Sequence, residues 1–309
     1  MSSHAIDVQN LTKVFGPFTA VDGLSFTVRQ GEIFGFLGAN GAGKSTTIRM
    51  LCGLLQSTSG SATVGGFDIN TQTDALRKNI GYMSQRFSLY DDLTVEQNIR
   101  FFGGVYGLRG EKLTDRMNWV ITMSGLKGRE ESLTRTLAGG FKQRLALGCA
   151  ILHEPKIVFL DEPTGGVDPV SRRNFWELIS RLSEQGVTIL VTTHFLDEAE
   201  YCNDIILIEA GKLLATGSPV ELKTQYIRSP ILEVSQIDPV ASLGKLTGLP
   251  WVEETSVFGS SLHVIVKDEK EGRVELARLL GEKVRIDRIV PSLEDVFLYL
   301  LGRSRGSGN

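Results

Sequence analysis

A glycine-rich segment near the start of the chain matches the pattern G-x-x-x-x-G-K-[S/T]. It reads Gly38-Ala39-Asn40-Gly41-Ala42-Gly43-Lys44-Ser45-Thr46 and follows the short apolar run Ile33–Leu37. Glycines allow backbone N–H groups to converge on phosphate oxygens, and the helix expected after them turns its positive end toward the same anion. Lys44 would reach the β- and γ-phosphates and Ser45 would ligate Mg²⁺. The segment therefore predicts nucleotide binding.

Two acidic residues end a second apolar run, Ile157-Val158-Phe159-Leu160-Asp161-Glu162. Buried parallel strands present ligand-handling groups at their carboxyl ends. Asp161 can hold Mg²⁺ through water, and Glu162 can orient or deprotonate an attacking water. Two acids alone would more often begin a solvated loop. Because the phosphate loop is also present, the pair predicts hydrolysis of the bound nucleotide.

The elements that must position these residues show a regular alternation. Strand candidates are residues 33–37, 157–160, 188–191 and 205–208, and helix candidates include residues 46–55 and 172–184. Strands that alternate with helices predict a parallel sheet wrapped by helices. Polar and apolar positions alternate in two runs within residues 5–30, which predicts a small antiparallel layer. Residues 94–136 predict a mostly helical insertion.

Further short motifs follow one another along the chain. They are Lys13-Val14-Phe15-Gly16, Gly81-Tyr82-Met83-Ser84-Gln85, Leu137-Ala138-Gly139-Gly140-Phe141-Lys142-Gln143, Gly166-Val167-Asp168-Pro169 and Thr192-Thr193-His194. A lone Phe or His is more often a packing residue. In this order, over residues 5 to about 225, the motifs resemble an ATP-binding-cassette (ABC) ATPase. The resemblance implies the α/β fold of a P-loop NTPase ABC cassette, with a parallel core sheet, an antiparallel β layer and a helical insertion.

The resemblance also implies ATP and Mg²⁺ as cofactors and a role for each motif residue. Phe15 would stack on adenine, Gln85 would contact Mg²⁺ and water, and His194 would contact the γ-phosphate. Catalysis would rest on Glu162, His194 and Gln85, and the metal on Ser45, Gln85 and Asp161. The nucleotide would be bound by the phosphate loop and Phe15, together with Ala138, Gly139, Gly140 and Asp168 of the signature and D-loop.

The segment from Leu137 to Gln143 resembles the LSGGQ signature with one departure. The resemblance implies a dimer in which the signature of one subunit closes over the ATP of the other, and the backbone N–H groups of Gly139 and Gly140 would supply a second anion cradle. Ala138 stands where the family has Ser, and a hydrogen bond to a charged group contributes roughly 1.5–3 kcal/mol. We expect weaker closure and retained activity. Gly165 likewise replaces the usual Ser before the D-loop.

Several segments resemble the ATPase subunits of ABC-2 type exporters, including multidrug efflux members. They are Gly140-Phe141-Lys142-Gln143-Arg144-Leu145, residues 87–98, residues 193–200 and residues 291–297. This implies a homodimer or heterodimer that drives a separate ABC-2 type permease, exporting drugs or other hydrophobic or lipid-like compounds. Residues 87–94 would line the groove for the permease; the less favoured alternative for Phe87, Leu89 and Tyr90 is core packing. The location would be the cytoplasmic face of the inner or plasma membrane.

Two alternatives stay open. One is a soluble, non-transport ABC ATPase for DNA repair, chromosome dynamics or translation, although the long insertions or fused second cassette of such proteins are absent. The other is a nucleotide-switched interaction protein without turnover, favoured only by Ala138. The charge of -3 is mixed, without a basic block, so no nucleic acid partner is expected. No run of about 18 apolar residues occurs and the start lacks a signal pattern, which predicts a cytoplasmic chain.

The C-terminal part has a different pattern. Residues 1–227 are expected to form the ATP-binding domain, with its helical subdomain at about 86–150, and residues 228–302 a small α+β accessory domain. Strand and helix runs follow the order β-α-β-β-α-β. His263 alternates with apolar neighbours and is expected to face the surface. Ser292 and Asp295 predict the start of a last helix, Gly302 its end, and residues 303–309 a disordered tail.

Overall fold

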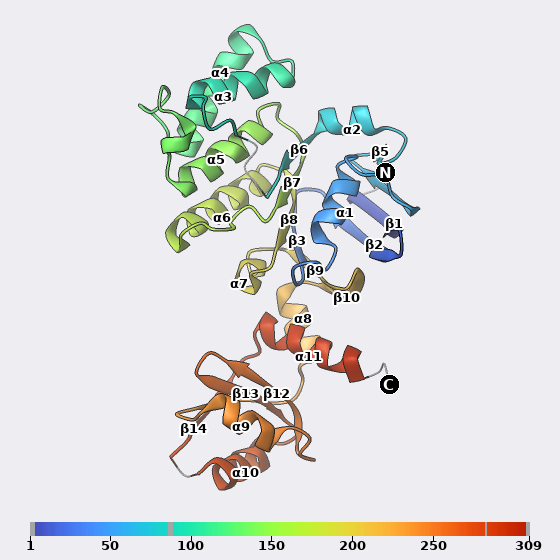
Figure 1. Cartoon of the computed structure of the whole chain (residues 1–309), viewed down its shortest axis with the longest axis vertical. Coiled ribbons are helices and arrows are strands. Elements are labelled where there is room, and N and C mark those ends of the chain that lie inside the picture. The colour runs from blue at the N-terminus through green and yellow to red at the C-terminus, as the bar shows by residue number, and fades with distance from the viewer. Residues whose placement is uncertain (1–3, 86–88, 282, 307–309) are drawn as a thin grey trace. The chain divides into compact units, whose positions relative to one another are not determined.

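The computed structural model describes residues 4–85, 89–281 and 283–306 (Figure 1). The chain divides into two compact units, one up to Thr216 and the other from Gly217. The second unit therefore begins 11 residues before residue 228, where the sequence predicted its start. Among the described residues, no helix is both long and apolar enough to cross a membrane.

A sheet of six described strands forms the centre of the first unit, in the order β10-β9-β3-β8-β7-β6. Their bounds are β3 (Ile33–Leu37), β6 (Ile80–Met83), β7 (Ile157–Asp161), β8 (Thr188–Thr193), β9 (Asp204–Glu209) and β10 (Lys212–Gly217). The four ladders that join β6, β7, β8, β3 and β9 are parallel. Buried, apolar strands are typical of parallel sheets, and the predicted sheet is confirmed.

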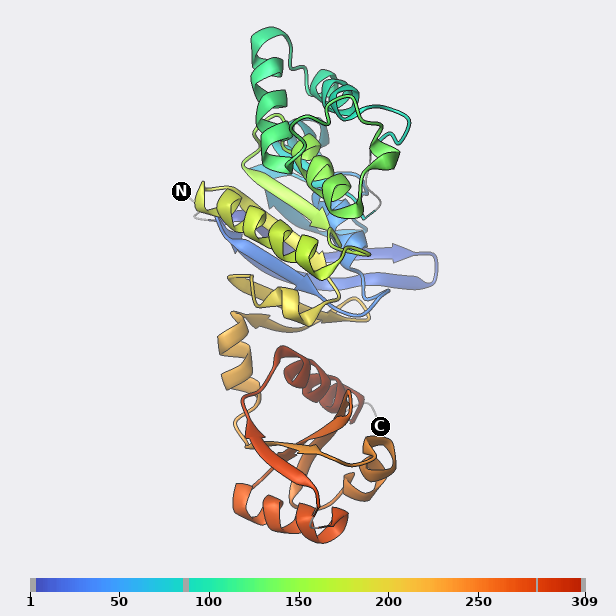
Figure 2. The same ribbon diagram turned by 90° about the vertical axis from the view of Figure 1, so that its left-hand side faces the viewer.

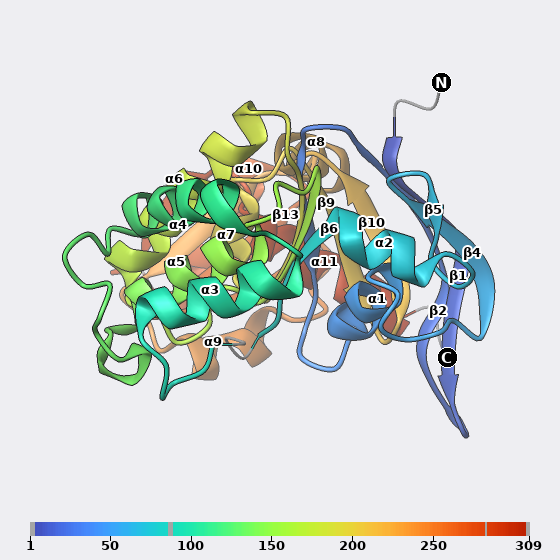
Figure 3. The same cartoon turned by 90° about the horizontal axis from the view of Figure 1, so that it is seen from above.

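An antiparallel layer packs against this sheet. Its strands are β1 (His4–Phe15), β2 (Phe18–Arg29), β4 (Ser59–Val64) and β5 (Phe67–Asp68), in the order β2-β1-β4-β5. The helices α1 (Lys44–Leu51) and α2 (Thr73–Asn79) complete this side, where Phe26 stacks on Phe34 with ring centroids 5.5 Å apart. Figure 3 shows this layer on one side of the central sheet and α3–α6 on the other.

The predicted helical insertion has its own apolar core. It contains α3 (Val95–Val105), α4 (Gly110–Ser124), the short helix η1 (Thr134–Thr136) and α5 (Gly139–Ala150). Thr94 begins α3 with a capping box to Gln97. The buried amide of Asn98 donates to the Tyr90 carbonyl and to Thr134 Oγ1, which ties the segment before α3 to η1. The helices α6 (Pro169–Glu184) and α7 (Leu196–Ala199) follow β7 and β8.

The second unit has the predicted order of elements after its first helix, α8 (Pro219–Tyr226). They are β11 (Ile231–Ser235), α9 (Pro239–Leu246), β12 (Val252–Phe258), β13 (Ser261–Val266), α10 (Glu269–Leu280), β14 (Arg285–Ile289) and α11 (Leu293–Gly306). The antiparallel sheet has the order β12-β13-β11-β14. Residues of α9 and α10 pack against one face of the sheet, and Figure 2 shows α11 on the opposite face from α10.

The surface position expected for His263 is wrong. Its side chain is buried, its Nδ1 lies 2.7 Å from Asp295 Oδ1, and its ring stacks on Phe258 at 3.9 Å. Alternation along β13 predicted a solvated face, but α11 covers that face. Ser292 N and Oγ also donate to Asp295, at 2.7 and 2.6 Å, which confirms the expected helix start.

The last helix does not end at Gly302 as expected, because α11 continues to Gly306. A Cβ at position 302 would lie 2.7 Å from a carboxylate oxygen of Glu254 on β12. Gly302 is thus an interior residue of α11, and the end of the Glu254 side chain lies close to it. The helix takes up the start of the tail expected to be disordered, and residues 307–309 lie outside the described residues.

We predict that Asp295→Asn lowers the free energy of unfolding by about 2 kcal/mol or more at pH 7, because it breaks a buried hydrogen-bonded pair. Burial alone would raise the pKa of Asp295, but hydrogen bonds from His263 and Ser292 hold this pKa below its ordinary value. The stabilisation is thus present above the ordinary pKa of about 3.9 and is lost as pH falls through the lower folded value. Urea unfolding at several pH values should show the wild-type advantage narrowing below about pH 4.

The matched control is Asp287→Asn on β14, where the carboxylate pairs with exposed Arg285 at 2.6 Å. A surface pair of this kind contributes at most about 1 kcal/mol. Equal losses in the two variants would contradict a stabilising role for the buried Asp295 cluster.

Candidate nucleotide site

The phosphate loop lies between β3 and α1, at the carboxyl edge of the central sheet. Gly41 and Gly43 have φ angles of 83° and 102°, in the left-handed region that favours glycine. A Cβ on Gly43 would also collide with the carbonyl oxygen of Ala20. The loop borders a cavity of about 390 Å³, lined by Phe18, Ala20, Asn40, Gly41, Gly43, Lys44, Ser45, Thr46, Gln85 and Glu162.

The ammonium group of Lys44 lies at the mouth of this loop. Its Nζ donates to the carbonyl oxygens of Gly38 and Ala39, at 2.8 and 3.2 Å, and lies 3.4 Å from Glu162 Oε1. The Lys44 side chain is buried. A buried cation is costly unless it is paired, and here the two carbonyl oxygens and the Glu162 carboxylate are its partners. Because Lys44 also lines the cavity, its positive charge lies where an anion can approach.

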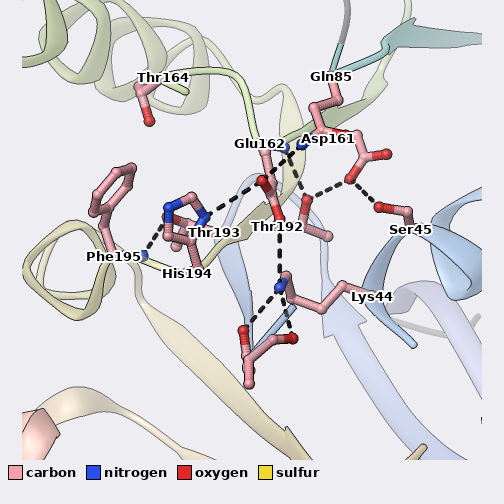
Figure 4. Close-up of polar contacts among 12 residues, drawn as sticks. Lys44, Ser45, Gln85, Asp161, Glu162, Thr164, Thr192, Thr193, His194 and Phe195 are labelled. Carbon is pink, nitrogen blue, oxygen red and sulfur yellow. Dashed lines mark hydrogen bonds and ion pairs between the residues drawn. The ribbon is translucent and has the colours of Figure 1, made fainter. Parts of the chain in front are cut away.

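Asp161 lies opposite Ser45 across the site (Figure 4). Ser45 Oγ and Thr192 Oγ1 donate to Asp161 Oδ1, at 2.9 and 2.7 Å. Hydroxyl, carboxylate and amide oxygens are the ligands that Mg²⁺ prefers, and Ser45, Asp161 and Gln85 all lie at this edge. These donors, with one carboxylate among them, therefore fit the predicted Mg²⁺. Within the described residues, no cluster of three or more His, Cys, Asp or Glu could hold a metal ion.

The Glu162 carboxylate contacts two further polar side chains of the site. Gln85 Nε2 donates to Glu162 Oε2 at 3.0 Å, and His194 Nδ1 lies 3.3 Å from the same oxygen. The backbone N–H of Glu162 donates to Thr192, and its φ of 46° is unusual for a residue with a side chain. Such backbone strain costs about 1–3 kcal/mol and persists where the surroundings enforce it, often at functional sites. The carboxylate is thereby aimed into the cavity.

The signature residues lie elsewhere. Ala138 is the N-cap of α5, and Gly139 and Gly140 are its first two helical residues. Ala138 and Gly139 are exposed, whereas a Cβ on Gly140 would collide with Ser171 at the start of α6. Among the described residues that line the cavity, none belongs to this segment. The structure thus separates the signature from the phosphate loop of the same chain.

Asp168 also lies apart from the cavity. It is the N-cap of α6, and its carboxylate accepts from the Ser171 N–H at 2.9 Å. Hydrogen bonds from the backbone and side chain of Ser171 hold the pKa of Asp168 below its ordinary value. The D-loop residue thus has a structural role within its own chain.

The aromatic residue beside the cavity is Phe18. Phe15, predicted to stack on adenine, is 46% exposed, and its ring lies 5.0 Å from the ammonium of Lys13. The two phenylalanines are opposite each other in the hairpin of β1 and β2. Within the described residues, Phe18 lines the cavity and Phe15 does not, so adenine stacking by Phe15 stays a prediction.

Sequence reasoning overlooked Thr192 as well as Phe18. Thr192 binds both Asp161 and the N–H of Glu162, so it fixes the two acids to the neighbouring strand. The available signal was a hydroxyl residue at the carboxyl end of a buried strand, two positions before His194.

Comparison with known proteins gives consistent matches. The sequence profile of the family described as "ABC transporter" matches residues 21–165. The probable multidrug ABC transporter ATP-binding protein YbhF of Escherichia coli K12 is 56% identical over 220 residues, 71% of this chain and 38% of YbhF. The Nod factor export ATP-binding protein I of Rhizobium sp. N33 is 38% identical over 98% of this chain and 99% of its own length.

A solved structure supports the fold. It is a dimeric post-hydrolysis state of an ATP-binding cassette bound to ADP and Pi, which is 26% identical, with a TM-score of 0.63 over 69% of this chain and 98% of that one. The chain spans little more than a third of the length of YbhF but nearly all of the Nod factor export protein. Together with the site geometry, these matches show that the chain belongs to the family of ABC transporter ATP-binding proteins.

Proposed function

We propose that this chain hydrolyses ATP as one subunit of a dimer and thereby powers a separate membrane permease. The convergence of Lys44, Gln85 and His194 on the Glu162 carboxylate, beside the phosphate loop, carries this proposal. A cation, an amide and an imidazole around one carboxylate are suited to hold a triphosphate and a water against a base.

Each residue then has a defined task. Glu162 accepts the proton of the attacking water, while Gln85 and His194 hold the carboxylate and its surroundings in place. Lys44 and the loop N–H groups bind the terminal phosphates. Ser45, Asp161 and Gln85 would hold Mg²⁺, which would neutralise charge on the phosphates. Because these groups lie at the edge of a parallel sheet, their positions are fixed, and the site needs little reorganisation during hydrolysis.

The position of the signature supports the proposed dimer. Ala138 and Gly139 present an exposed helix N-terminus, a favourable place for phosphate oxygens, away from the phosphate loop of their own chain. A second subunit can bring such an end over the ATP of the first. The dimeric cassette with ADP and Pi among the structural relatives supports this arrangement. Either a homodimer or a heterodimer satisfies it.

An apolar surface on the helical insertion is the proposed contact for the permease, which we assign to the ABC-2 type. Tyr90, Phe101 and Val105 are 49%, 44% and 65% exposed, and the rings of Tyr90 and Phe101 meet edge to face at 4.8 Å. Next to them, Leu89 and Phe102 line a small cavity with Tyr82 and Tyr106. Phe87, also expected at this contact, lies outside the described residues. Exposed aromatic clusters are typical of protein contacts.

The transported compound is assigned by class. The relatives are named for multidrug transport and Nod factor export, so we infer export of drugs or other hydrophobic or lipid-like molecules. The chain would act at the cytoplasmic face of the membrane, bound to its permease. A repair or translation ATPase is less favoured, because both named relatives are transport proteins.

We predict that Glu162→Gln lowers kcat by about a hundredfold or more, because Gln cannot accept the proton of water. The variant should still bind MgATP and accumulate as an ATP-dependent dimer in size-exclusion chromatography. Adding Lys44→Ala should abolish that dimer, since the phosphates lose their cation. Normal phosphate release by Glu162→Gln would contradict the role of Glu162 as the base.

We expect Ala138→Ser to raise the free energy of unfolding by about 1 kcal/mol, because Ser caps α5 better than Ala. It should also raise the ATPase rate or lower the half-saturating ATP concentration, since the hydroxyl can donate to phosphate. Ala138→Gly is the matched control, because Gly caps a helix nearly as well but has no hydroxyl. Equal ATPase gains in both variants, or none in either, would show that the hydroxyl is not limiting.

We predict that Phe101→Ser reduces the amount of permease that copurifies from the membranes of the native host. The substitution replaces apolar contact area at the proposed docking surface with a polar group. Val274→Ser on α10 is the control, because Val274 is likewise exposed, at 65%, but belongs to the second unit. Undiminished copurification with Phe101→Ser would place the permease contact elsewhere.

A further inference from the structure

A buried carboxylate joins two loops of the nucleotide site. Glu198, on α7, is fully buried and accepts hydrogen bonds from Thr164 and Thr193. Thr164 follows Glu162 by two residues, and Thr193 directly precedes His194. Both threonine side chains are also buried. A buried charge must be fully hydrogen-bonded to be tolerated, so these bonds hold the two loops at a fixed separation (Figure 4 shows Thr164, Thr193 and His194).

Arg172 completes this cluster from the first turns of α6. Its Nε lies 3.4 Å from Glu198 Oε1, and its guanidinium lies 4.1 Å from the ring of Phe195. The Phe195 ring in turn lies 4.1 Å from the imidazole of His194, and the Phe195 N–H donates to Thr193 Oγ1 at 3.0 Å. The imidazole is therefore supported through both the backbone and the ring of its neighbour.

The same helix end contacts the signature. Ser171, adjacent to Arg172, lies against Gly140 so closely that a Cβ there would collide with it. The start of α6 thus touches Gly140 on one side and the carboxylate of Glu198 on the other. In a dimer, these two sides belong to different ATP sites.

We propose that Glu198 is a positioning residue, which holds His194 against Glu162 and links it to the signature end of α6. This role rests on the proposed ATPase function. Glu198 is not one of the described residues that line the cavity, so we expect it to act through Thr193 and Phe195. Disturbing it should slow hydrolysis while leaving the phosphate loop, and hence ATP binding, intact.

The first test is Glu198→Gln in the full-length chain, assayed by phosphate release over a range of ATP concentrations. Gln has nearly the same volume but cannot carry the charge that Arg172 and both hydroxyls contact. We expect kcat to fall about tenfold to a hundredfold, the loss that corresponds to one hydrogen bond to a charged group, with KM little changed. Glu200→Gln, at the exposed end of the same short helix, is the matched control and should keep the wild-type kcat.

A second pair of variants guards against a folding defect. Thr193→Val keeps the side-chain shape but removes the hydroxyl, so it should lower Tm, because the buried Glu198 loses a donor, and should also lower kcat at a temperature where the variant is fully folded. Thr193→Ser restores the hydroxyl and should recover kcat. A merely structural role would instead leave the kcat of fully folded Glu198→Gln, Thr193→Val and Thr193→Ser at the wild-type value.

A double-mutant cycle with His194→Ala decides whether Glu198 acts through the imidazole. If it does, Glu198→Gln should have little further effect on the single-turnover rate of His194→Ala. Additive effects, or a wild-type kcat in Glu198→Gln, would overturn this inference alone. An inactive wild-type chain, under conditions where it dimerises with MgATP, would overturn the proposed function and this role with it.

Discussion

The Glu162 carboxylate, held between a lysine, an amide and an imidazole, is the interaction on which the rest of the structure depends. Its partners come from the phosphate loop, the end of β6 and the end of β8. They meet only because the strands are parallel and end at one edge of the sheet. Thr192 adds a fixed link to the neighbouring strand, and the strained backbone of Glu162 directs the carboxylate into the cavity.

The helix α6 connects this site with the surface that a second subunit would use. Its N-cap is Asp168, its first turn packs against Gly140, and Arg172 reaches the buried Glu198 beside the His194 loop. In the proposed dimer, a rigid helix with contacts at both places would give each subunit a physical means to relate the ATP that it binds to the ATP that it covers. The prediction that Ala138 weakens closure concerns the exposed start of α5 and leaves these contacts of α6 unchanged.

Much of this could be predicted from the sequence, because apolar runs and their polar ends are local signals. The strands, the phosphate loop and the order βαββαβ were all readable in this way. Phe18 was not, since hairpin geometry decides which of two nearby phenylalanines faces the cavity. Nor was the burial of His263, because only the packing of α11 on the sheet reveals that neither face is free. The end predicted for the last helix at Gly302 was also wrong, because a glycine is only a local signal and α11 continues through it to Gly306.

The central claim is that the ATP site is shared between two subunits, and a mixing experiment tests it most directly. Gly139→Asp adds a negative charge to the anion cradle, and a Cβ there meets nothing within 4 Å in its own chain, so the variant should fold but fail to hydrolyse ATP. Glu162→Gln should fail in the other half of the site. When the two are mixed, dimers with one intact composite site should form and phosphate release should recover. Full activity of Gly139→Asp alone, or no recovery in the mixture, would contradict a shared site.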